Sequence, residues 1–319
     1  MTTMELVVTR TTREAEGVRG FDLRRADATP LPVFTAGAHI DLHLPNGLTR
    51  QYSLLNDPRE RHRYCLGISL PADSRGGSRY LHEHVKAGDR LTAGQPRSLF
   101  AIDAAAAEHV FIAGGIGITP FMSMIRWCEA HGQRWRLLYC VRSRARAAFL
   151  WDLAAYHERV LLYVDEDAGE GHPDLRGFLS DAPAASHVYC CGPAPQMQAV
   201  AAAAAGLGID AGAVHFERFS AGQLAPTDGG DRPFDIVLQR HGGHFTVPPG
   251  ATILETLERN GLSMPFSCRE GLCRACEVPM LAGKADHRDS VLSQAERNAH
   301  TSIMPCISRA VSGELVLDI

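Results

Sequence analysis

The sequence predicts a multidomain protein with three parts: an antiparallel β-barrel, an α/β domain with a parallel sheet, and a small α+β domain that carries four cysteines. Short alternating strands separated by turns occupy roughly the first 100 residues. Apolar runs then alternate with helical stretches. A Gly- and Pro-rich segment ends that pattern, and a cysteine-bearing segment follows it. At 319 residues the chain is long enough for several cores.

The barrel is predicted from strands with a period of two. Residues His39–Leu44 and Tyr64–Leu70 read as short strands, and Pro45-Asn46-Gly47 forms a turn. Few helices interrupt this pattern, which favours an antiparallel barrel over a parallel sheet. We place the barrel domain at residues 1–104.

The α/β domain begins where the pattern changes, near residue 108. Val110–Ala113 is a continuous apolar run, followed by a glycine turn and a helical stretch over Pro120–His131. Further apolar runs lie at residues 136–141, 160–164 and 187–191, and an alanine-rich helix is predicted at 196–205. Strands that alternate with helices indicate a parallel sheet with crossovers. We place this domain at residues 105–222.

The last part of the chain begins after a linker at residues 223–233, which is rich in Gly, Pro and polar residues. In the domain at 234–319, Phe234–Leu238 and Gly243–Val247 are predicted to form a hairpin, and Ile253–Asn260 a helix. The cysteine loop follows this helix.

Composition excludes several classes of function. The formal net charge is −4, with 45% hydrophobic and 21% charged residues, so no polybasic stripe suits nucleic acid or anionic lipid. The N-terminus lacks an apolar signal region, and no 18 apolar residues run together, so we expect a cytoplasmic protein. The nine cysteines are an odd count and unevenly spread, which favours metal binding over disulfides.

Four cysteines form the strongest motif. Cys268, Cys273 and Cys276 have the spacing C-x4-C-x2-C, and Cys306 lies 30 positions after Cys276. This is the ligand order of a plant-type [2Fe-2S] cluster. The alternative is a zinc site or a set of buried thiols, but zinc sites more often pair two C-x2-C motifs and only one is present.

On these residues the segment from Phe234 resembles plant-type ferredoxins, and the whole chain resembles the phthalate dioxygenase reductase family. The resemblance implies an FMN-binding barrel, an NAD-binding domain and a C-terminal [2Fe-2S] ferredoxin domain of the β-grasp type, in this order.

Two segments match the flavin motifs of this family. Arg50-Gln51-Tyr52-Ser53 fits the R-x-Y-S pattern, with a cation for phosphate, an aromatic ring and a hydroxyl for the N5 edge. Arg75-Gly76-Gly77-Ser78 offers unhindered amides for the FMN phosphate. An ordinary strand and a flexible hairpin tip are the alternatives, and the choice of FMN over FAD comes from the resemblance alone. The predicted flavin residues are Arg50, Tyr52, Ser53, Gly67, Ile68, Ser69, Arg75, Gly76, Gly77 and Ser78.

Two further motifs match the pyridine-nucleotide site of the family. The turn G-G-I-G-I-T-P at residues 114–120 follows an apolar strand and opens a helix, so its amides can face a pyrophosphate. The motif C-G-P at residues 191–193 ends another strand. The predicted nucleotide residues are Gly114, Gly115, Gly117, Thr119, Cys191, Gly192, Pro193 and Phe219. The resemblance places Thr119 near the flavin, Cys191 beside the nicotinamide, and Phe219 of the H-F-E-x-F motif on the flavin ring; with Ser53 these are the predicted catalytic residues.

The preferred nucleotide depends on competing charges. Arg142 and Arg144 could suit the 2′-phosphate of NADPH, whereas the acidic stretch Asp165–Asp167 opposes it. We follow the family and expect NADH.

The resemblance implies a function as the NADH-dependent reductase component of a two-component system. Electrons would pass from NADH through FMN and the [2Fe-2S] cluster to a Rieske-type non-heme iron oxygenase, through a transient protein contact. Its substrate would be an aromatic acid or a related compound, altered by dioxygenation or O-demethylation. The alternatives are a reductase for another oxygenase class, in which the ferredoxin domain is usually N-terminal, and a non-enzymatic iron-sulfur redox sensor, for which no helix-turn-helix or basic face is present.

Overall fold

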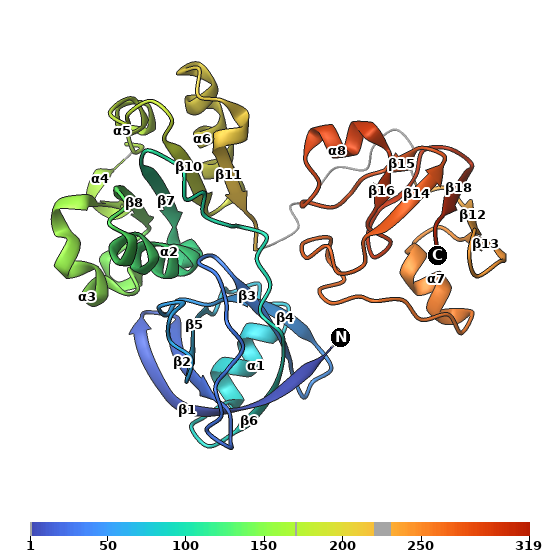
Figure 1. Ribbon diagram of the computed structural model, residues 1–319, viewed down its shortest axis with the longest axis horizontal. Helices are drawn as coiled ribbons and strands as arrows, with labels where there is room; N and C mark the ends of the chain where they lie inside the picture. The colour runs from blue at the N-terminus through green and yellow to red at the C-terminus, as the bar shows by residue number, and fades with distance from the viewer. Residues whose placement is uncertain (1, 170, 220–230) are drawn as a thin grey trace. The chain divides into compact units, whose positions relative to one another are not determined.

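The computed structural model describes residues 2–169, 171–219 and 231–319. The chain forms two compact units, Met1–Glu217 and Arg218–Ile319 (Figure 1). The predicted linker at 223–233 lies mostly outside the described residues, so the predicted domain boundaries there stay predictions.

The first part of unit one is a six-stranded antiparallel sheet with the order β4-β3-β6-β1-β2-β5. Its strands are β1 Thr3–Ala15, β2 Val18–Arg24, β3 His39–His43, β4 Thr49–Ser53, β5 Tyr64–Ser69 and β6 Arg90–Gly94. The backbone amide of Leu55, just after β4, donates to the carbonyl of Cys65 in β5 at 3.0 Å. This bond joins the two edge strands, so the sheet closes into the predicted barrel.

The second part of unit one is a five-stranded parallel sheet with the order β11-β10-β7-β8-β9. Its strands are β7 His109–Gly114, β8 Trp135–Val141, β9 Val160–Val164, β10 His187–Cys191 and β11 Val214–Glu217; its helices are α2 Ile118–His131, α3 Leu150–Leu153, α4 Asp165–Ala168, α5 Leu175–Ser180 and α6 Ala194–Gly206. The strand order reverses between β7 and β10. The carboxyl ends of these two strands therefore flank the crevice where open α/β sheets bind ligands.

Barrel and parallel sheet share one core. Cys65 of the barrel is buried in the same cluster as Phe111 and Phe121 of the α/β part. Along β5 the side chains of Leu66 and Ile68 enter the barrel core instead, as the period of a strand requires. The opposite face of β5 is thus turned toward the parallel sheet.

Unit two has the mixed sheet order β13-β12-β18-β14-β16, in which β12 and β18 are parallel. The strands are β12 Phe234–Leu238, β13 His244–Val247, β14 Val278–Ala282, β16 Ser302–Ile303 and β18 Glu314–Leu317, with a small pair β15 Ala285–Asp286 and β17 Arg309–Ala310. Helix α7 Ile253–Arg259 begins with a capping box between Thr252 and Glu255 and buries Leu254 and Leu257; α8 spans Gln294–Ala299. This is the predicted β-grasp arrangement.

One helix in the barrel was not predicted. α1, Gly77–His84, follows directly after Gly76, whose φ of 92° and ψ of −27° are left-handed. Adjacent glycines indicate a turn, but Leu81 is completely buried and anchors the helix to the barrel core. Tertiary packing therefore determines this helix more than its local propensity does.

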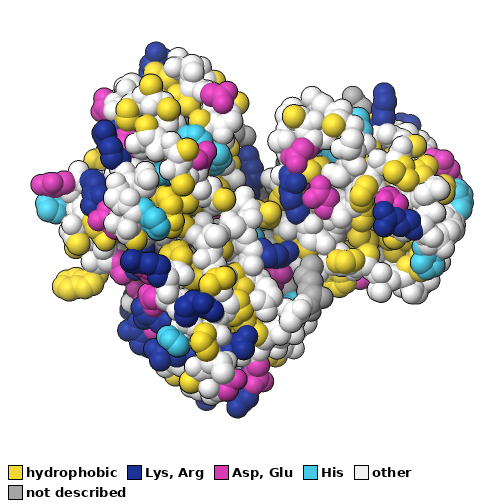
Figure 2. Space-filling view, in the orientation of Figure 1, with side chains coloured by type: hydrophobic (Ala, Val, Ile, Leu, Met, Phe, Trp, Pro, Cys, Tyr) yellow, Lys and Arg dark blue, Asp and Glu magenta, His cyan; other side chains and the backbone are white. Residues whose placement is uncertain are grey.

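No helix in the described part of the chain is long and apolar enough to cross a membrane. On the face shown in Figure 2, basic and acidic side chains both occur across the surface.

Arg309 ties three segments of unit two together. Its side chain is nearly completely buried and its guanidinium donates to the carbonyls of Ala251, Arg232 and Pro248. We predict that Arg309→Met destabilises this unit by about 2–4 kcal/mol, because three carbonyls, of which that of Ala251 belongs to a buried residue, lose a charged donor. Hydrogen–deuterium exchange of the β12 and β18 amides measures it. Arg240→Met, which removes an exposed ion pair with Asp318, is the matched control and should cost under about 1 kcal/mol; equal effects would contradict the prediction.

Candidate cofactor sites

The four predicted cluster ligands meet in unit two. Cys268, Cys273, Cys276 and Cys306 are all buried. Their sulfurs make two contacting pairs, Cys268 with Cys273 and Cys276 with Cys306. In residues 2–169, 171–219 and 231–319, no three His, Cys, Asp or Glu side chains converge on a position for one ion. Two pairs suit two irons better than a single zinc, because each iron takes two thiolates and the sulfides complete the cluster.

Backbone amides around these cysteines are placed where they can stabilise negatively charged sulfur. The amides of Glu270 and Leu272 donate to Cys268 Sγ at 3.3 and 3.4 Å. Gly271 has a φ of 68°, and a Cβ there would lie 2.9 Å from the Cα of Asp289. The loop therefore needs glycine for both conformation and space. The hydrogen bond with the paired sulfur, followed by burial, raises the pKa of Cys268, whereas the hydrogen bond with Cys306 lowers the pKa of Cys276. Two bound irons would supply positive charge that favours the ionised form of all four thiols.

The two predicted flavin segments lie side by side in the barrel. Arg50 of β4 donates to the carbonyl of Arg75 at 3.3 Å. Its side chain crosses Gly77, where a Cβ would lie 2.5 Å from Arg50 Cγ. The guanidinium thus sits beside the first turn of α1, whose amides have no partner within the helix. The amides of Gly76 and Arg79 donate to Ser74 Oγ at 3.3 Å, which leaves those of Gly77 and Ser78 beside the guanidinium. A cation next to helix N-terminal amides is an arrangement that fits a phosphate.

The rest of the predicted flavin set lies on β4 and β5. The Ser53 hydroxyl is buried and has no hydrogen-bond partner in the part of the chain that the structure describes. A buried hydroxyl without a partner is costly, so it fits a position that a polar ligand atom completes. Burial raises the pKa of Tyr52. Ile68 points into the barrel core, so it could meet a flavin only through its backbone, whereas Ser69 lies on the opposite face.

The two predicted nucleotide motifs interlock at the strand-order reversal. A Cβ on Gly117 would lie 2.0 Å from the carbonyl oxygen of Cys191. A Cβ on Gly114 would lie 3.0 Å from the Cα of Gly192 and 2.0 Å from Gln196 Oε1. Neither glycine can carry a side chain without moving backbone or Gln196. The turn after β7 and the end of β10 are therefore in direct contact, at the strand ends where open α/β sheets bind ligands.

Helix α2 starts from this contact. Gly115–Gly117 forms a short 3-10 turn, and Thr119 donates from Oγ1 to the carbonyl of Ile116 at 3.0 Å. Thr119 is buried, and so is Cys191. Thr119 and Cys191, the predicted catalytic residues of the two nucleotide motifs, are thus both buried in one corner of unit one, where the glycine turn contacts the end of β10.

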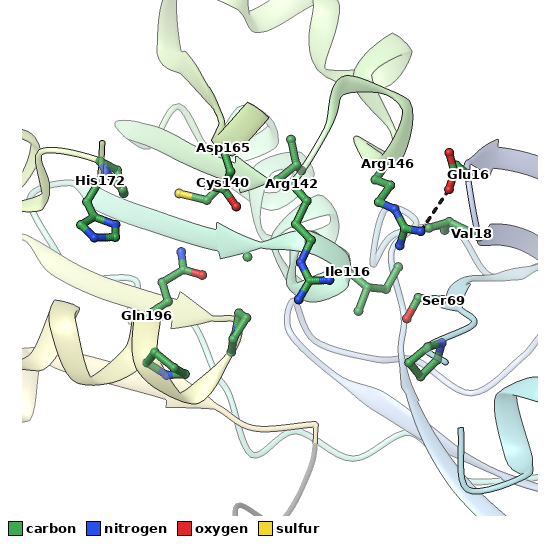
Figure 3. Close-up of a pocket in the computed structure, with 18 of the residues that line it drawn as sticks. Glu16, Val18, Ser69, Ile116, Cys140, Arg142, Arg146, Asp165, His172 and Gln196 are labelled. Atoms are coloured by element: carbon green, nitrogen blue, oxygen red, sulfur yellow. Dashed lines mark hydrogen bonds and ion pairs between the residues drawn. The ribbon is translucent and has the colours of Figure 1, made fainter. Parts of the chain in front are cut away.

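A pocket of about 680 Å³ opens beside this corner, a volume typical of ligand sites (Figure 3). Ser69 of the barrel, Ile116 of the glycine turn, and Gln196 of α6 line it together with Arg142 and Asp165, which follow β8 and β9. Figure 3 shows Arg142 reaching into the pocket between Gln196 and Ile116. The pocket thus lies at the carboxyl edge of the parallel sheet, as the fold requires.

The three arginines after β8 have different environments. Arg144 pairs with Asp167 at 3.1 Å, and Arg146 pairs with Glu16 of the barrel at 3.0 Å. Arg142 has no ion-pair partner within 4 Å among the residues described. Arg142 is therefore the guanidinium of this loop that is available to a pyrophosphate in the pocket. The sequence could not single it out, because all three follow the same strand.

A partly buried acidic side chain lies next to Cys191. Glu217 of β11 is the register partner of Cys191 in β10. The residue keeps some exposed area, but its Oε2 is buried and has no hydrogen-bond partner in the described residues. Burial raises the pKa of Glu217 to about 8. Burial also raises the pKa of the Cys191 thiol, with a smaller contribution from Glu217.

This raised pKa predicts a pH dependence of stability. A carboxyl whose pKa is higher in the folded than in the unfolded protein stabilises the fold below pH 4.5, and the contribution is lost as pH rises through about 8. The Tm of the wild type should therefore fall across this window more steeply than that of Glu217→Gln. Thermal unfolding measured from pH 5 to 8 checks it, with Glu158→Gln at an exposed position as control. A Glu217→Gln curve parallel to the wild type would refute the prediction.

Phe219 is 43% exposed, and its predicted stacking role stays a prediction. Sequence reasoning missed Gln196, Glu16 and Arg146 as pocket residues. Gln196 could have been found, because it follows C-G-P by three positions in a predicted helix. Glu16 and Arg146 could not, because they are 130 residues apart in the chain.

Comparisons with known proteins identify two domain families in the chain. Residues 111–202 match the model of the oxidoreductase NAD-binding domain, and residues 236–311 match the 2Fe-2S iron-sulfur cluster binding domain. The chain is 45% identical to phenoxybenzoate dioxygenase subunit beta of Ectopseudomonas oleovorans, covering 96% of this chain and 94% of that protein.

Two solved structures are similar over nearly the whole chain. Phthalate dioxygenase reductase, described as a modular structure for electron transfer from pyridine nucleotides to [2Fe-2S], matches with TM-score 0.75 and 36% identity over 99% of this chain and 98% of that one. An intact type IV self-sufficient cytochrome P450 monooxygenase matches with TM-score 0.88 and 34% identity over 99% of this chain and 41% of that one. With these matches, the chain belongs to the phthalate dioxygenase reductase family and is an oxidoreductase with an NAD-binding domain and a [2Fe-2S] domain.

Proposed function

We propose that this reductase passes electrons from NADH to a Rieske-type oxygenase in the cytoplasm, through a transient contact with the oxygenase. One observation carries the proposal. The glycine turn at 114–120 and the C-G-P motif at 191–193 contact each other beside a ligand-sized pocket, and the same chain brings four buried cysteines together as two pairs. The oxygenase would act on an aromatic acid or a related compound, by dioxygenation or O-demethylation.

Residues of unit one would bind and align the two redox partners. Arg50 and the amides at Gly76, Gly77 and Ser78 would hold the FMN phosphate, and Ser53 would donate to the flavin. Arg142 would bind the pyrophosphate of NADH.

The nicotinamide would then lie between Thr119 and Cys191, which the glycine contact holds at a fixed separation. FMN, when bound, accepts hydride and returns single electrons, which a [2Fe-2S] cluster requires. Thr119 and Cys191 are both buried, so this corner excludes water from the transfer.

The experiment that tests the proposal is an anaerobic titration with NADH, followed by visible absorbance and electron paramagnetic resonance. Bleaching of the flavin and a rhombic one-electron signal are expected. A cluster that stays oxidised would contradict the proposed path. Reconstitution with a purified Rieske oxygenase and, separately, with a cytochrome P450 then distinguishes the acceptors, because the similarity to the P450 fusion favours the second as an alternative.

The ligand assignment predicts that Cys306→Ala abolishes the rhombic signal and electron delivery to cytochrome c. Reduction of the flavin by NADH should stay within about twofold, because the cysteines belong to unit two, which has its own core. Cys128→Ala, which removes a buried thiol in unit one, is the control and should retain the signal. An intact signal in Cys306→Ala would reject the assignment.

The pocket predicts that Arg142→Gln weakens NADH binding about tenfold, since one charged hydrogen-bond donor to the pyrophosphate is lost. Arg144→Gln should change the dissociation constant by less than about twofold, because Arg144 is paired with Asp167 and does not line the pocket. Fluorescence titration of the oxidised protein with a non-reducing NADH analogue measures both constants. Equal losses in the two variants would exclude the special role of Arg142.

A further inference from the structure

Phe149 has a backbone conformation that aromatic residues rarely adopt. Its φ of 60° and ψ of 19° are left-handed, and it stands just before helix α3. Phe149 is also only 5% exposed, so its conformation is set within the protein interior and not in a solvent-exposed turn. A bulky residue stays in this region only where its surroundings hold it there, and such residues cluster at functional sites.

Hydrogen bonds on both sides hold Phe149 in place. The amide of Ala148 donates to Tyr139 Oη at 3.0 Å, and the Phe149 carbonyl accepts from the amide of Leu153 at 3.1 Å. Earlier in the loop the carbonyl of Ala145 accepts from the amide of Glu16 in the barrel at 2.7 Å. The loop after β8 is thus fastened to both the parallel sheet and the barrel.

The ring of Phe149 fills the space where Gly67 would carry a side chain. A Cβ on Gly67 would lie 2.6 Å from Phe149 Cζ and 3.0 Å from its Cε2. It would also lie 3.0 Å from Thr119 Cγ2. The φ of Gly67 is not in the left-handed region, so this glycine is required for space and not for conformation.

These contacts join three segments at one point: strand β5 of the barrel, the start of α2, and the loop after β8. Thr119 is a predicted catalytic residue, and Gly67 lies on the strand expected along the flavin. Phe149 itself lies on neither motif. The Phe149 ring and the Thr119 methyl group therefore both lie against Gly67, and the ring limits how closely the loop after β8 can approach the flavin strand beside the nucleotide turn.

We propose that Phe149 is a positioning residue for hydride transfer, which keeps β5 and Thr119 in register, and that Gly67 lacks a side chain to admit it. This inference rests on the proposed function. Hydride transfer depends steeply on alignment, since a misplacement on the order of 1 Å can cost roughly 100-fold in rate. NADH binding, which uses the pocket residues, depends on Phe149 much less.

The test is a double-mutant cycle of Gly67→Ala and Phe149→Leu in the full-length protein. Stopped-flow reduction of the flavin gives the limiting rate at saturating NADH and the apparent dissociation constant of NADH. Each single variant should lower the limiting rate about tenfold, with the dissociation constant within about threefold. The double variant should be at least about threefold faster than the product of the single effects predicts, because removing the ring admits the new methyl group.

Thermal unfolding of the same four proteins without FMN measures the contact independently of activity. Non-additive Tm changes are expected, whereas Gly94→Ala is the matched control in β6, because a Cβ there comes no closer than 3.5 Å to any atom. Additive Tm changes, or coupled Tm changes with unaltered limiting rates, would overturn the positioning role.

Two further outcomes are distinguishable. If the wild type is not reduced by NADH, the proposed function fails, whatever the Tm cycle shows. If Gly67→Ala does not fold, recovery of folding in the double variant supports the contact. Phe149→Leu then decides the positioning role alone: a lowered limiting rate supports it, and an unchanged rate overturns it.

Discussion

The structure of unit one depends on a contact between two backbone segments that leaves no room for a side chain. Gly117 meets the carbonyl of Cys191, and Gly114 meets Gly192, at the reversal of strand order. Strand β7 pairs with β10 in parallel, so the register of one fixes the end of the other. This backbone contact fixes the distance between Thr119 and Cys191, so no hydrogen bond between the two side chains is needed to hold them.

The barrel extends this constraint to the flavin side. A shared core, the Glu16–Arg146 ion pair and the Phe149 contact fasten it to the parallel sheet. Hydride transfer requires direct contact between donor and acceptor, so both must be held by one packed body. Unit two has a separate core around its cysteines. Unit one thus corresponds to the two-electron hydride step, and unit two to the one-electron step at the cluster.

The sequence predicts those parts of the site that depend on local pattern. Strand periods, the glycine turn after Val110–Ala113 and the spacing from Cys268 to Cys276 are all readable within short windows. Helix α1 was missed because its glycine start indicates a turn, and only burial of Leu81 against the barrel stabilises it. Phe149 was missed because its partner Gly67 is distant in the chain, and no local signal links them.

The charges at the pocket also depend on contacts between residues distant in the chain, and they bear on the choice between NADH and NADPH. Arg142 and Arg144 together suggested a place for a 2′-phosphate, but in the fold Arg144 pairs with Asp167 at the surface and does not line the pocket. Asp165 lines the pocket directly after β9, and Arg142 directly follows β8, the neighbouring strand of the sheet. One available guanidinium suffices for a pyrophosphate, whereas an additional phosphate near Asp165 would meet a carboxylate of like charge. The pairing of arginines with acidic residues, and not their number, therefore favours NADH.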